Sequence, residues 1–161
     1  MSSFFIDFEA FQHGNGKYRL KELCIMDVDQ PLQPLYFLFK GDKKFEALTS
    51  GEQQTYSYQR RYLHRIGWEE GFSRYCRKCV WYHIKEYFPH IRNSIVYVMG
   101  EQKMKFLQQE FSSLNFCEYN VTFSLLPQIA PNIACFYREH GEHCACLKCF
   151  RLYTHYITQP E

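Results

Sequence analysis

Three apolar runs near the start of the chain show the period-two alternation of β-strands, and a Gly-rich turn follows the first of them. We expect these runs to pair as an antiparallel meander. The segment after the third run is rich in turn residues, which predicts a loop and then a short helix. The expected ranges are strands over 4–11, 18–26 and 34–40, a turn over 13–16, a loop over 41–57 and a helix over 58–65.

The rest of the chain alternates between helical and strand patterns. Apolar residues recur at helical spacing from Phe72 to Phe88, until Pro89 ends the segment. The complete order is β-β-β-α-β-α-β-α, which predicts one α/β domain over residues 1–161, with a mixed five-stranded sheet flanked by helices. The remaining expected ranges are helices over 72–88, 101–114 and 142–157, and strands over 94–99 and 120–125.

The first expected strand carries two carboxylates among large apolar residues. Asp7 and Glu9 are two positions apart and therefore point to the same face of the strand. Two carboxylates this close repel each other and resist burial unless a positive charge lies between them, and in enzymes that charge is usually a divalent metal ion. The alternative is an edge strand on which both carboxylates face water.

Composition and charge exclude several classes of protein. The 161 residues carry a net charge of +2 and 22% charged residues, which argues against a disordered chain and against a strongly electrostatic nucleic-acid binder. No apolar run approaches the roughly 20 residues of a membrane span, and the start of the chain has no secretory signal pattern. We therefore expect an intracellular protein, cytoplasmic or nuclear, whose eight cysteines are reduced and serve core packing or zinc rather than disulfides.

The element order and three short motifs resemble exonucleases of the DEDD class, which have the ribonuclease-H-like fold. In that family the first strand carries Asp-x-Glu, similar to Asp7-x-Glu9, and the last helix opens with His-x4-Asp. Here the last expected helix opens with His143, and Lys148 stands at the Asp position. The helix after the fourth strand places Lys103 where the family has its remaining Asp.

The two lysines change what this resemblance implies about chemistry. Two-metal phosphodiester cleavage uses about four carboxylates, and this chain keeps two of them. We interpret Lys103, together with Lys148, as an internal ion pair to Asp7 and Glu9 that takes the place of metal, so that Mg²⁺ binding is disfavoured. The alternative is that both lysines extend to water.

A second group of candidate residues is rich in cysteine and histidine. Cys135, His140, His143 and Cys144 lie close together in the sequence, and thiolate and imidazole ligands at short spacing suit tetrahedral zinc. The alternative is a Cys-rich helix packed in the core beside surface histidines.

Part of this second group resembles the Maelstrom domain, a degenerate DEDD-like domain of the small-RNA pathway that carries a Glu-Cys-His-Cys zinc site. Cys135, His140 and Cys144 are similar to its last three ligands, although the short Cys-x2-His spacing of that family is absent here. The resemblance implies a structural zinc ion. Candidates for a fourth ligand are Glu69, Glu70 and His64.

Two further patterns carry less chemical information. Residues 64–71 contain His-x3-Trp-x2-Gly, which is similar to a motif in uncharacterised arthropod proteins and implies a family without a known activity. The pair Cys76-x2-Cys79 lies on the apolar stripe of the helix expected over 72–88 and lacks an obvious partner set. We therefore expect both residues in the core, together with Cys24 and Cys117.

A basic run with interleaved aromatic residues begins at the end of the expected loop. Such surfaces bind single strands through phosphate pairing and base stacking, although a solvated helix face explains the pattern nearly as well. The candidate nucleic-acid-binding residues are Arg60, Arg61, Tyr62, Arg65, Arg74 and Lys78.

Together the patterns favour a degenerate nuclease, a domain derived from a DEDD exonuclease that binds RNA or another single strand and has lost metal-dependent catalysis. Two alternatives stay open. An active 3′–5′ exonuclease would hold one metal ion with Asp7 and Glu9 and use His143 as general base. A protein-interaction module of a small-RNA or mobile-element pathway would bind a protein partner and keep only the fold.

Overall fold

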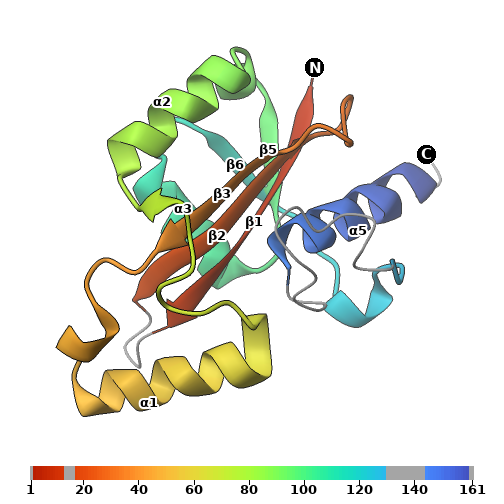
Figure 1. Cartoon of the computed structure of the whole chain (residues 1–161). Helices are drawn as coiled ribbons and strands as arrows, with labels where there is room; N and C mark the ends of the chain where they lie inside the picture. The colour runs from red at the N-terminus through yellow and green to blue at the C-terminus, as the bar shows by residue number, and fades with distance from the viewer. Residues whose placement is uncertain (1, 13–16, 130–143, 160–161) are drawn as a thin grey trace.

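The computed structural model describes residues 2–12, 17–129 and 144–159. Its centre is a mixed six-stranded sheet with the strand order β4-β3-β2-β1-β5-β6 (Figure 1). Strands β1, β2 and β3 pair antiparallel, whereas β5 lies parallel to β1, β6 parallel to β5 and β4 parallel to β3. The strands are β1 (Ser3–Gln12), β2 (Tyr18–Asp27), β3 (Leu35–Lys40), β4 (Ser73–Arg74), β5 (Ile95–Val98) and β6 (Asn115–Glu118).

The described part of the chain has four α-helices, arranged around the sheet. In Figure 1, α2 lies on one side of the sheet, α5 on the other, and α1 below the carboxyl end of β1. None of the described helices is long and apolar enough to cross a membrane. The helices are α1 (Ser50–Gln59), α2 (Arg77–Tyr87), α3 (Glu101–Glu110) and α5 (Ala145–Thr158), with a π-helical turn η2 (Arg60–His64) and the short 3₁₀ segments η1 (Phe45–Ala47), η3 (Ile91–Asn93) and η4 (Phe123–Leu125).

Strand β1 supplies all three hydrophobic clusters, because its side chains alternate between the two faces of the sheet. Phe4, Ile6 and Phe8 pack with α2 and α3, and Phe5 packs with α5 on the opposite face of the sheet. Further along β1, Phe11 packs with Tyr56 of α1 and with Trp68 in a smaller cluster. Asp7 and Glu9 share the face of Phe5, which directs both carboxylates towards α5. The α/β class and the antiparallel start of the sheet are confirmed.

Helix α1 lies inside the segment predicted as a loop over 41–57, and that prediction is wrong. The Thr49 hydroxyl accepts a hydrogen bond from the Glu52 backbone N–H, and the Glu52 carboxylate accepts one from the Thr49 N–H, both at 3.2 Å. This reciprocal capping box starts the helix. The helix itself has no apolar stripe, so hydrophobic periodicity did not reveal it.

The predicted helix over 72–88 begins too early. Residues 73–74 form β4 beside β3, and the helix begins at Arg77 with Cys76 as its N-cap. Cys76 and Cys79 are therefore exposed, not core residues as predicted. Cys117 is exposed as well, because β6 is an edge strand, whereas Cys24 is buried as predicted.

The sheet has six strands instead of the predicted five, and its last strand is displaced from the prediction. Residues 120–125 do not form a strand, because β5 pairs with the earlier segment Asn115–Glu118, and the chain then turns into η4. β6 is short and only half-buried, which leaves little alternation in the sequence. The additional strand, β4, is two residues long.

Candidate functional site

The carboxylates of β1 lie where the connections of the sheet diverge. The parallel pairing of β1 with β5 ends at the pair Ile6–Val98, and β1 continues alone on that side through Asp7, Phe8 and Glu9. β2, the next strand in the chain, pairs with one edge of β1, and β5 pairs with the opposite edge. In open α/β sheets, ligand sites form at the carboxyl ends of strands at such a point.

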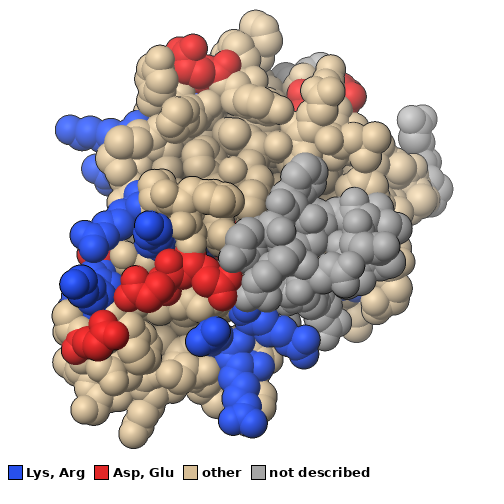
Figure 2. All heavy atoms as spheres, viewed as in Figure 1, with Lys and Arg blue, Asp and Glu red and all other residues tan. Residues whose placement is uncertain are grey.

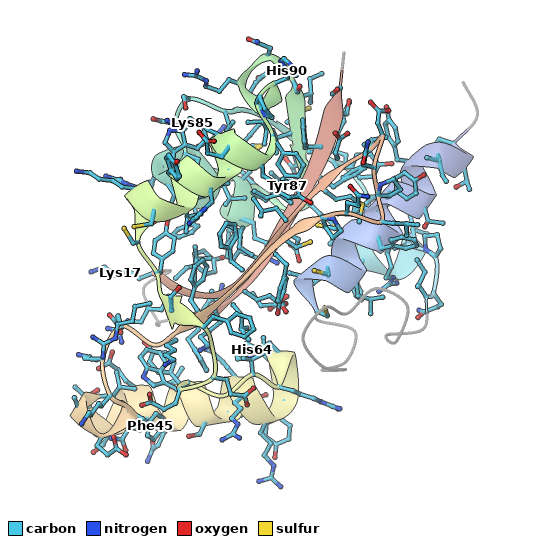
Figure 3. All side chains as sticks on the ribbon, turned by 45° about the horizontal axis from the view of Figure 1, so that its top comes forward. Lys17, Phe45, His64, Lys85, Tyr87 and His90 are labelled. Atoms are coloured by element: carbon cyan, nitrogen blue, oxygen red, sulfur yellow. The ribbon has the colours of Figure 1, made fainter. Side chains whose placement is uncertain are left out.

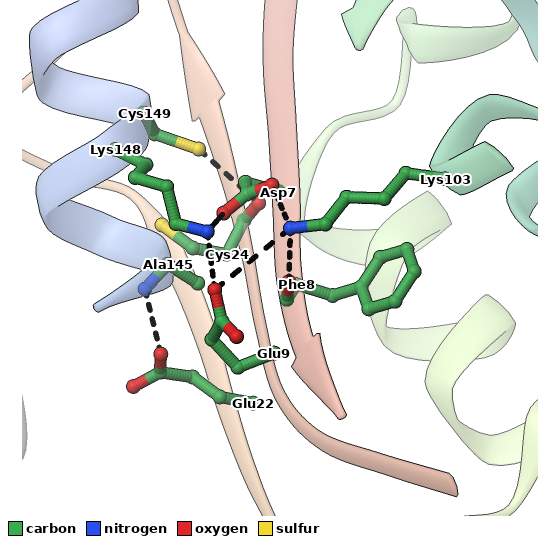
Figure 4. Close-up of polar contacts among 9 residues, drawn as sticks. All are labelled: Asp7, Phe8, Glu9, Glu22, Cys24, Lys103, Ala145, Lys148 and Cys149. Carbon is green, nitrogen blue, oxygen red and sulfur yellow. Dashed lines mark hydrogen bonds and ion pairs between the residues drawn. The ribbon is translucent and has the colours of Figure 1, made fainter. Parts of the chain in front are cut away.

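Two lysines from different helices close this position (Figure 4). The Lys103 ammonium on α3 lies 2.8 Å from Asp7 Oδ1 and 3.8 Å from Glu9 Oε1, and it donates a 2.7 Å hydrogen bond to the Phe8 carbonyl. The Lys148 ammonium on α5 lies 3.3 Å from Asp7 Oδ2 and donates directly to Glu9 Oε1. These four charged residues, Asp7, Glu9, Lys103 and Lys148, form the lysine–carboxylate cluster.

The lysine–carboxylate cluster is largely removed from water. The side chain of Asp7 is 1% exposed, that of Lys148 7% and that of Lys103 23%. The predicted contact of Lys103 with Asp7 and Glu9 is confirmed, and the alternative in which both lysines extend to water is wrong. The edge-strand alternative for Asp7 and Glu9 is also wrong, because β1 is an interior strand of the sheet.

Each lysine stands in the first turn of its helix, where the helix dipole disfavours a cation. Gly100 precedes α3 with φ of 99°, a conformation that a residue with a side chain would adopt only under strain. This turn starts α3 beside the end of β5, so that Lys103 reaches across to β1. The ion pairs offset the unfavourable position of both lysines.

Burial and charge act in opposite directions on the ionisation of the cluster. Burial by itself raises the pKa of Glu9, but the ammonium groups of Lys148 and Lys103 outweigh it and hold that pKa below its ordinary value. Burial likewise opposes the charge on Lys148, but Asp7 and Glu9 outweigh it and raise the pKa of the amine. Glu9 and Lys148 are therefore both ionised around neutral pH.

A third carboxylate, which the sequence analysis missed, lies beside the cluster. Glu22 is opposite Glu9 on β2 and is fully buried. It accepts 2.6 Å hydrogen bonds from the Tyr36 hydroxyl and from the Ala145 backbone N–H at the start of α5 (Figure 4). An anion at this helix end is favourable. The available signal was a glutamate in the strand position between the buried Leu20 and Cys24.

The donor set of the cluster does not fit Mg²⁺. A divalent ion needs carboxylate oxygens that are free to coordinate it, and here the two carboxylates are already paired with two ammonium groups that would repel the ion. Across residues 2–12, 17–129 and 144–159, no three His, Cys, Asp or Glu side chains are grouped so as to hold a metal ion.

The predicted zinc site falls mostly outside the described residues. Cys135, His140 and His143, the last also the candidate general base, lie in the segment 130–143 that the structure does not describe. Cys144 is described and is fully buried beside Cys146 in the cluster under α5. Zinc binding stays a prediction.

The candidates for a fourth zinc ligand, His64 at the end of η2 and Glu69 and Glu70 after it, all have packing or hydrogen-bonding roles. His64 is buried with its ring 4.6 Å from that of Phe11, and its Nδ1 accepts from the Ile66 N–H (Figure 3). Glu69 accepts a hydrogen bond from the Phe45 N–H, and Glu70 accepts one from the Gly67 N–H.

The His-x3-Trp-x2-Gly pattern fixes the same segment against the end of the sheet. The indole of Trp68 stacks on Tyr56 at 5.1 Å and donates from Nε1 to the Lys43 carbonyl. Gly71 has φ of 149° and passes so close to the β3 backbone that a Cβ would lie 2.3 Å from the Phe39 carbonyl carbon. Buried Lys21 donates to the carbonyls of Phe39, Trp68 and Glu70, which ties β3 to this segment.

The predicted nucleic-acid-binding residues divide between two places. One group, the basic turn, consists of Arg60, Arg61, Tyr62 and Arg65 on η2 and its C-cap. Figure 2 shows Lys and Arg side chains gathered over the carboxyl end of α1, where this turn lies. The other predicted residues, Arg74 and Lys78, are exposed on β4 and α2.

The basic turn lies next to a cavity with aromatic walls. An open cavity of about 430 Å³ is lined by Ser57, Arg60, Arg61 and Arg65. Ser57 and Arg60 also line a second cavity of about 350 Å³, whose walls include Phe45, Tyr56 and Trp68 and whose rim carries the carboxylates of Glu46, Glu69 and Glu70.

Comparison with models of known protein families gives no match, and comparison with curated proteins gives none either.

Proposed function

We propose that this chain is a ribonuclease-H-like domain that binds single-stranded RNA or DNA without cutting it. The observation that carries the proposal is the pairing of two lysines with the two carboxylates of β1 that follow the end of its pairing with β5. The order of elements supports the fold assignment, because three antiparallel strands are followed by alternating helices and strands. This order and the Asp7-x-Glu9 motif are the features that resemble DEDD exonucleases.

The absence of cleavage follows from charge. Phosphodiester cleavage of the DEDD type depends on divalent ions held by carboxylates, which stabilise the attacking and leaving oxygens. In this chain Lys103 and Lys148 neutralise Asp7 and Glu9 from two sides, and they hold the charge of the site near zero. A divalent ion could enter only by displacing the buried ammonium group of Lys148 and the partly exposed one of Lys103.

Binding is assigned to the basic turn and the cavity beside it. Arg60 and Arg61 are exposed and can pair with phosphates, and the exposed ring of Tyr62 offers a stacking surface. The aromatic cavity is of a size that accepts one nucleobase. Of the carboxylates that line it, Glu46 and Glu69 are exposed and can accept hydrogen bonds from base amino groups.

This arrangement favours a single strand over a duplex. A base can enter a cavity only when it is unstacked and unpaired, which is the normal state of single-stranded loops and ends. The modest net charge of +2 predicts modest affinity that falls steeply with salt.

The experiment is a binding titration of fluorescently labelled single-stranded RNA and DNA, with a duplex of the same sequence for comparison. Wild-type protein is expected to bind the single strands more tightly than the duplex. The double variant Arg60→Ala/Arg61→Ala is expected to weaken binding at least several-fold and to flatten its salt dependence. The matched control is Arg92→Ala/Lys105→Ala, which removes the same charge from exposed positions on η3 and α3.

Equal losses in the two double variants would show that the basic turn is not the binding surface. No binding of any oligonucleotide at low salt would refute the proposed function and leave the protein-interaction module as the surviving alternative.

A further inference from the structure

The exposed pair Cys76-x2-Cys79 stands at the amino end of α2. Cys76 is the N-cap of the helix, with an extended backbone at φ of −134° and ψ of 111°. Its sulfur accepts a hydrogen bond from the Cys79 backbone N–H at 3.4 Å, which holds the first turn of the helix between the two cysteines. The two cysteines are therefore neighbours in the first turn of α2, and both are exposed at the protein surface.

The surroundings make the two thiols chemically different. The hydrogen bonds from the thiol and the N–H of Cys79, with the positive charge of Lys78, lower the pKa of the Cys76 thiol. The same contact raises the pKa of the Cys79 thiol, because its proton is held by Cys76. Cys76 is thus the better nucleophile of the pair at neutral pH, and Cys79 is placed to react second.

The other cysteines of the described chain lack this combination. Cys24, Cys144, Cys146 and Cys149 are buried between the sheet and α5. Burial raises the pKa of the Cys24, Cys146 and Cys149 thiols well above the ordinary range. Cys117 is exposed on β6, but its sulfur has only a weak 3.8 Å contact with the neighbouring Glu118 carbonyl. An exposed, hydrogen-bonded pair of thiols at a helix amino end has the properties of a thiol–disulfide exchange site.

We propose that Cys76 and Cys79 form a redox-active dithiol that exchanges with anionic low-molecular-weight disulfides of the glutathione type. The Cys76 thiolate attacks one sulfur of the disulfide, forms a mixed disulfide and releases the first thiolate. The Cys79 thiol then loses its proton and attacks the Cys76 sulfur, which forms the Cys76–Cys79 disulfide and releases the second thiolate. Two protein thiols are oxidised, and one disulfide is reduced to two thiols.

The charge around the pair selects for an anionic partner. Arg77 and Lys78 lie between the two cysteines in the sequence, Arg74 lies two residues before Cys76, and all three are exposed. Arg77 lies 4.0 Å from Glu110, at the limit of an ion pair, and is 57% exposed. Glutathione carries carboxylates that these cations attract. The inference is independent of the proposed nucleic-acid binding.

The test is incubation of the folded chain with oxidised glutathione, followed by acid quenching, alkylation and mass spectrometry of the peptides. Wild-type protein is expected to form an internal Cys76–Cys79 disulfide that dithiothreitol reverses. Cys79→Ser is expected to stop at a mixed disulfide between glutathione and Cys76. Cys76→Ser keeps a side chain that can cap the helix, so the variant is expected to fold and to show little reaction at Cys79.

Cys117 serves as the exposed reference thiol within the same molecule. In Cys79→Ser, the mixed disulfide is expected to form several-fold faster at Cys76 than at Cys117. Equal rates at the two positions would overturn the assigned role of Cys76. Failure of wild-type protein to form the internal disulfide would overturn the dithiol as a whole.

Discussion

Asp7 is paired through both of its carboxylate oxygens, each with a different lysine. Oδ1 contacts Lys103 and Oδ2 contacts Lys148, and the same two lysines also reach Glu9. Each carboxylate therefore depends on lysines from two helices, and each lysine depends on the two carboxylates of β1. Loss of one lysine leaves a buried negative charge without compensation, which costs more than the intact ion pair contributes.

Lys148→Met is the most direct test at the residue scale. The substitution keeps the apolar stem and removes the charge, and we expect it to lower the free energy of unfolding by about 3–5 kcal/mol. Denaturant-induced unfolding measures the change. The control is Lys105→Met, which removes an exposed lysine whose partner Glu101 is equally exposed, and it should change stability by less than about 1 kcal/mol.

The added substitution Glu9→Gln should restore part of the stability of Lys148→Met, because the unpaired carboxylate is then neutral. If the double variant is no more stable than the single one, the loss does not come from stranded charge.

The cluster also predicts how stability depends on pH. The pKa of Glu9 is lower in the folded chain than its ordinary value of 4.5, so its contribution is complete above pH 4.5 and is lost as the pH falls through the lower folded value. The pKa of Lys148 is raised above 10.5, so its contribution is complete below pH 10.5 and is lost as the pH rises through the folded value. We expect a broad maximum of stability between these limits.

Unfolding measured between pH 3 and pH 7 tests the acid side of this prediction. Glu9→Gln should lose less stability on acidification than wild type. An equal loss in both proteins would show that Glu9 is not responsible for it.

At the scale of elements, the cluster depends on the amino ends of α3 and α5. Both helices begin with a lysine in the first turn, although carboxylates are favoured there. The structure compensates α5 with Glu22, which accepts a hydrogen bond from its first N–H. Both lysine positions face Asp7 and Glu9 on β1. A carboxylate placed at either position would therefore lie beside Asp7 and Glu9.

The double variant Lys103→Asp/Lys148→Asp exploits this arrangement. Four buried carboxylates would repel one another, so we expect a large loss of stability that Mg²⁺ or Mn²⁺ partly reverses. Thermal unfolding with and without each ion measures the effect, and wild type should show no comparable shift. If added metal has no effect on the double variant, the positions of the two lysines do not correspond to metal-ligand positions.

The sequence predicted those elements whose buried apolar residues recur with the spacing of a strand or a helix. β1, β2, β3, β5, α3 and α5 were predicted within a few residues, because each has an apolar face against a hydrophobic cluster. α1 was missed because its signal was the Thr49 capping box and not a stripe. The start of α2 was misplaced because the exposed residues Phe72 and Cys76 were counted as part of its apolar face.

At the scale of the whole molecule, two regions have different properties. The lysine–carboxylate cluster is buried midway along β1, whereas the basic turn is exposed beside the aromatic cavity. The contact of Lys103 with Asp7 was predictable because a like-charge pair in an apolar strand needs a positive partner. Glu22 was missed because its partners, the start of α5 and Tyr36, are distant in sequence and come together only in the fold.

Tyr62→Ala tests the basic turn as a binding surface. The Tyr62 ring is 57% exposed and lies 4.8 Å from the ring of Tyr58, so it can stack on a base without a change of fold. We expect the variant to lose about 1–3 kcal/mol of binding free energy for a single-stranded oligonucleotide. Tyr82→Ala is the matched control, because Tyr82 is 58% exposed on α2. Equal effects of the two substitutions would argue against stacking at Tyr62.

The central claim is that the chain binds a single strand at the basic turn and does not cut it, because Lys103 and Lys148 occupy the place of metal ions beside Asp7 and Glu9. The most direct measurement is incubation of end-labelled single-stranded RNA and DNA with the wild-type protein and Mg²⁺ or Mn²⁺, with the products resolved by length and the bound fraction measured in parallel. The account predicts bound, full-length strands whose binding does not depend on the metal ion. Metal-dependent shortening of the strands that Asp7→Asn abolishes would contradict it and establish an active nuclease.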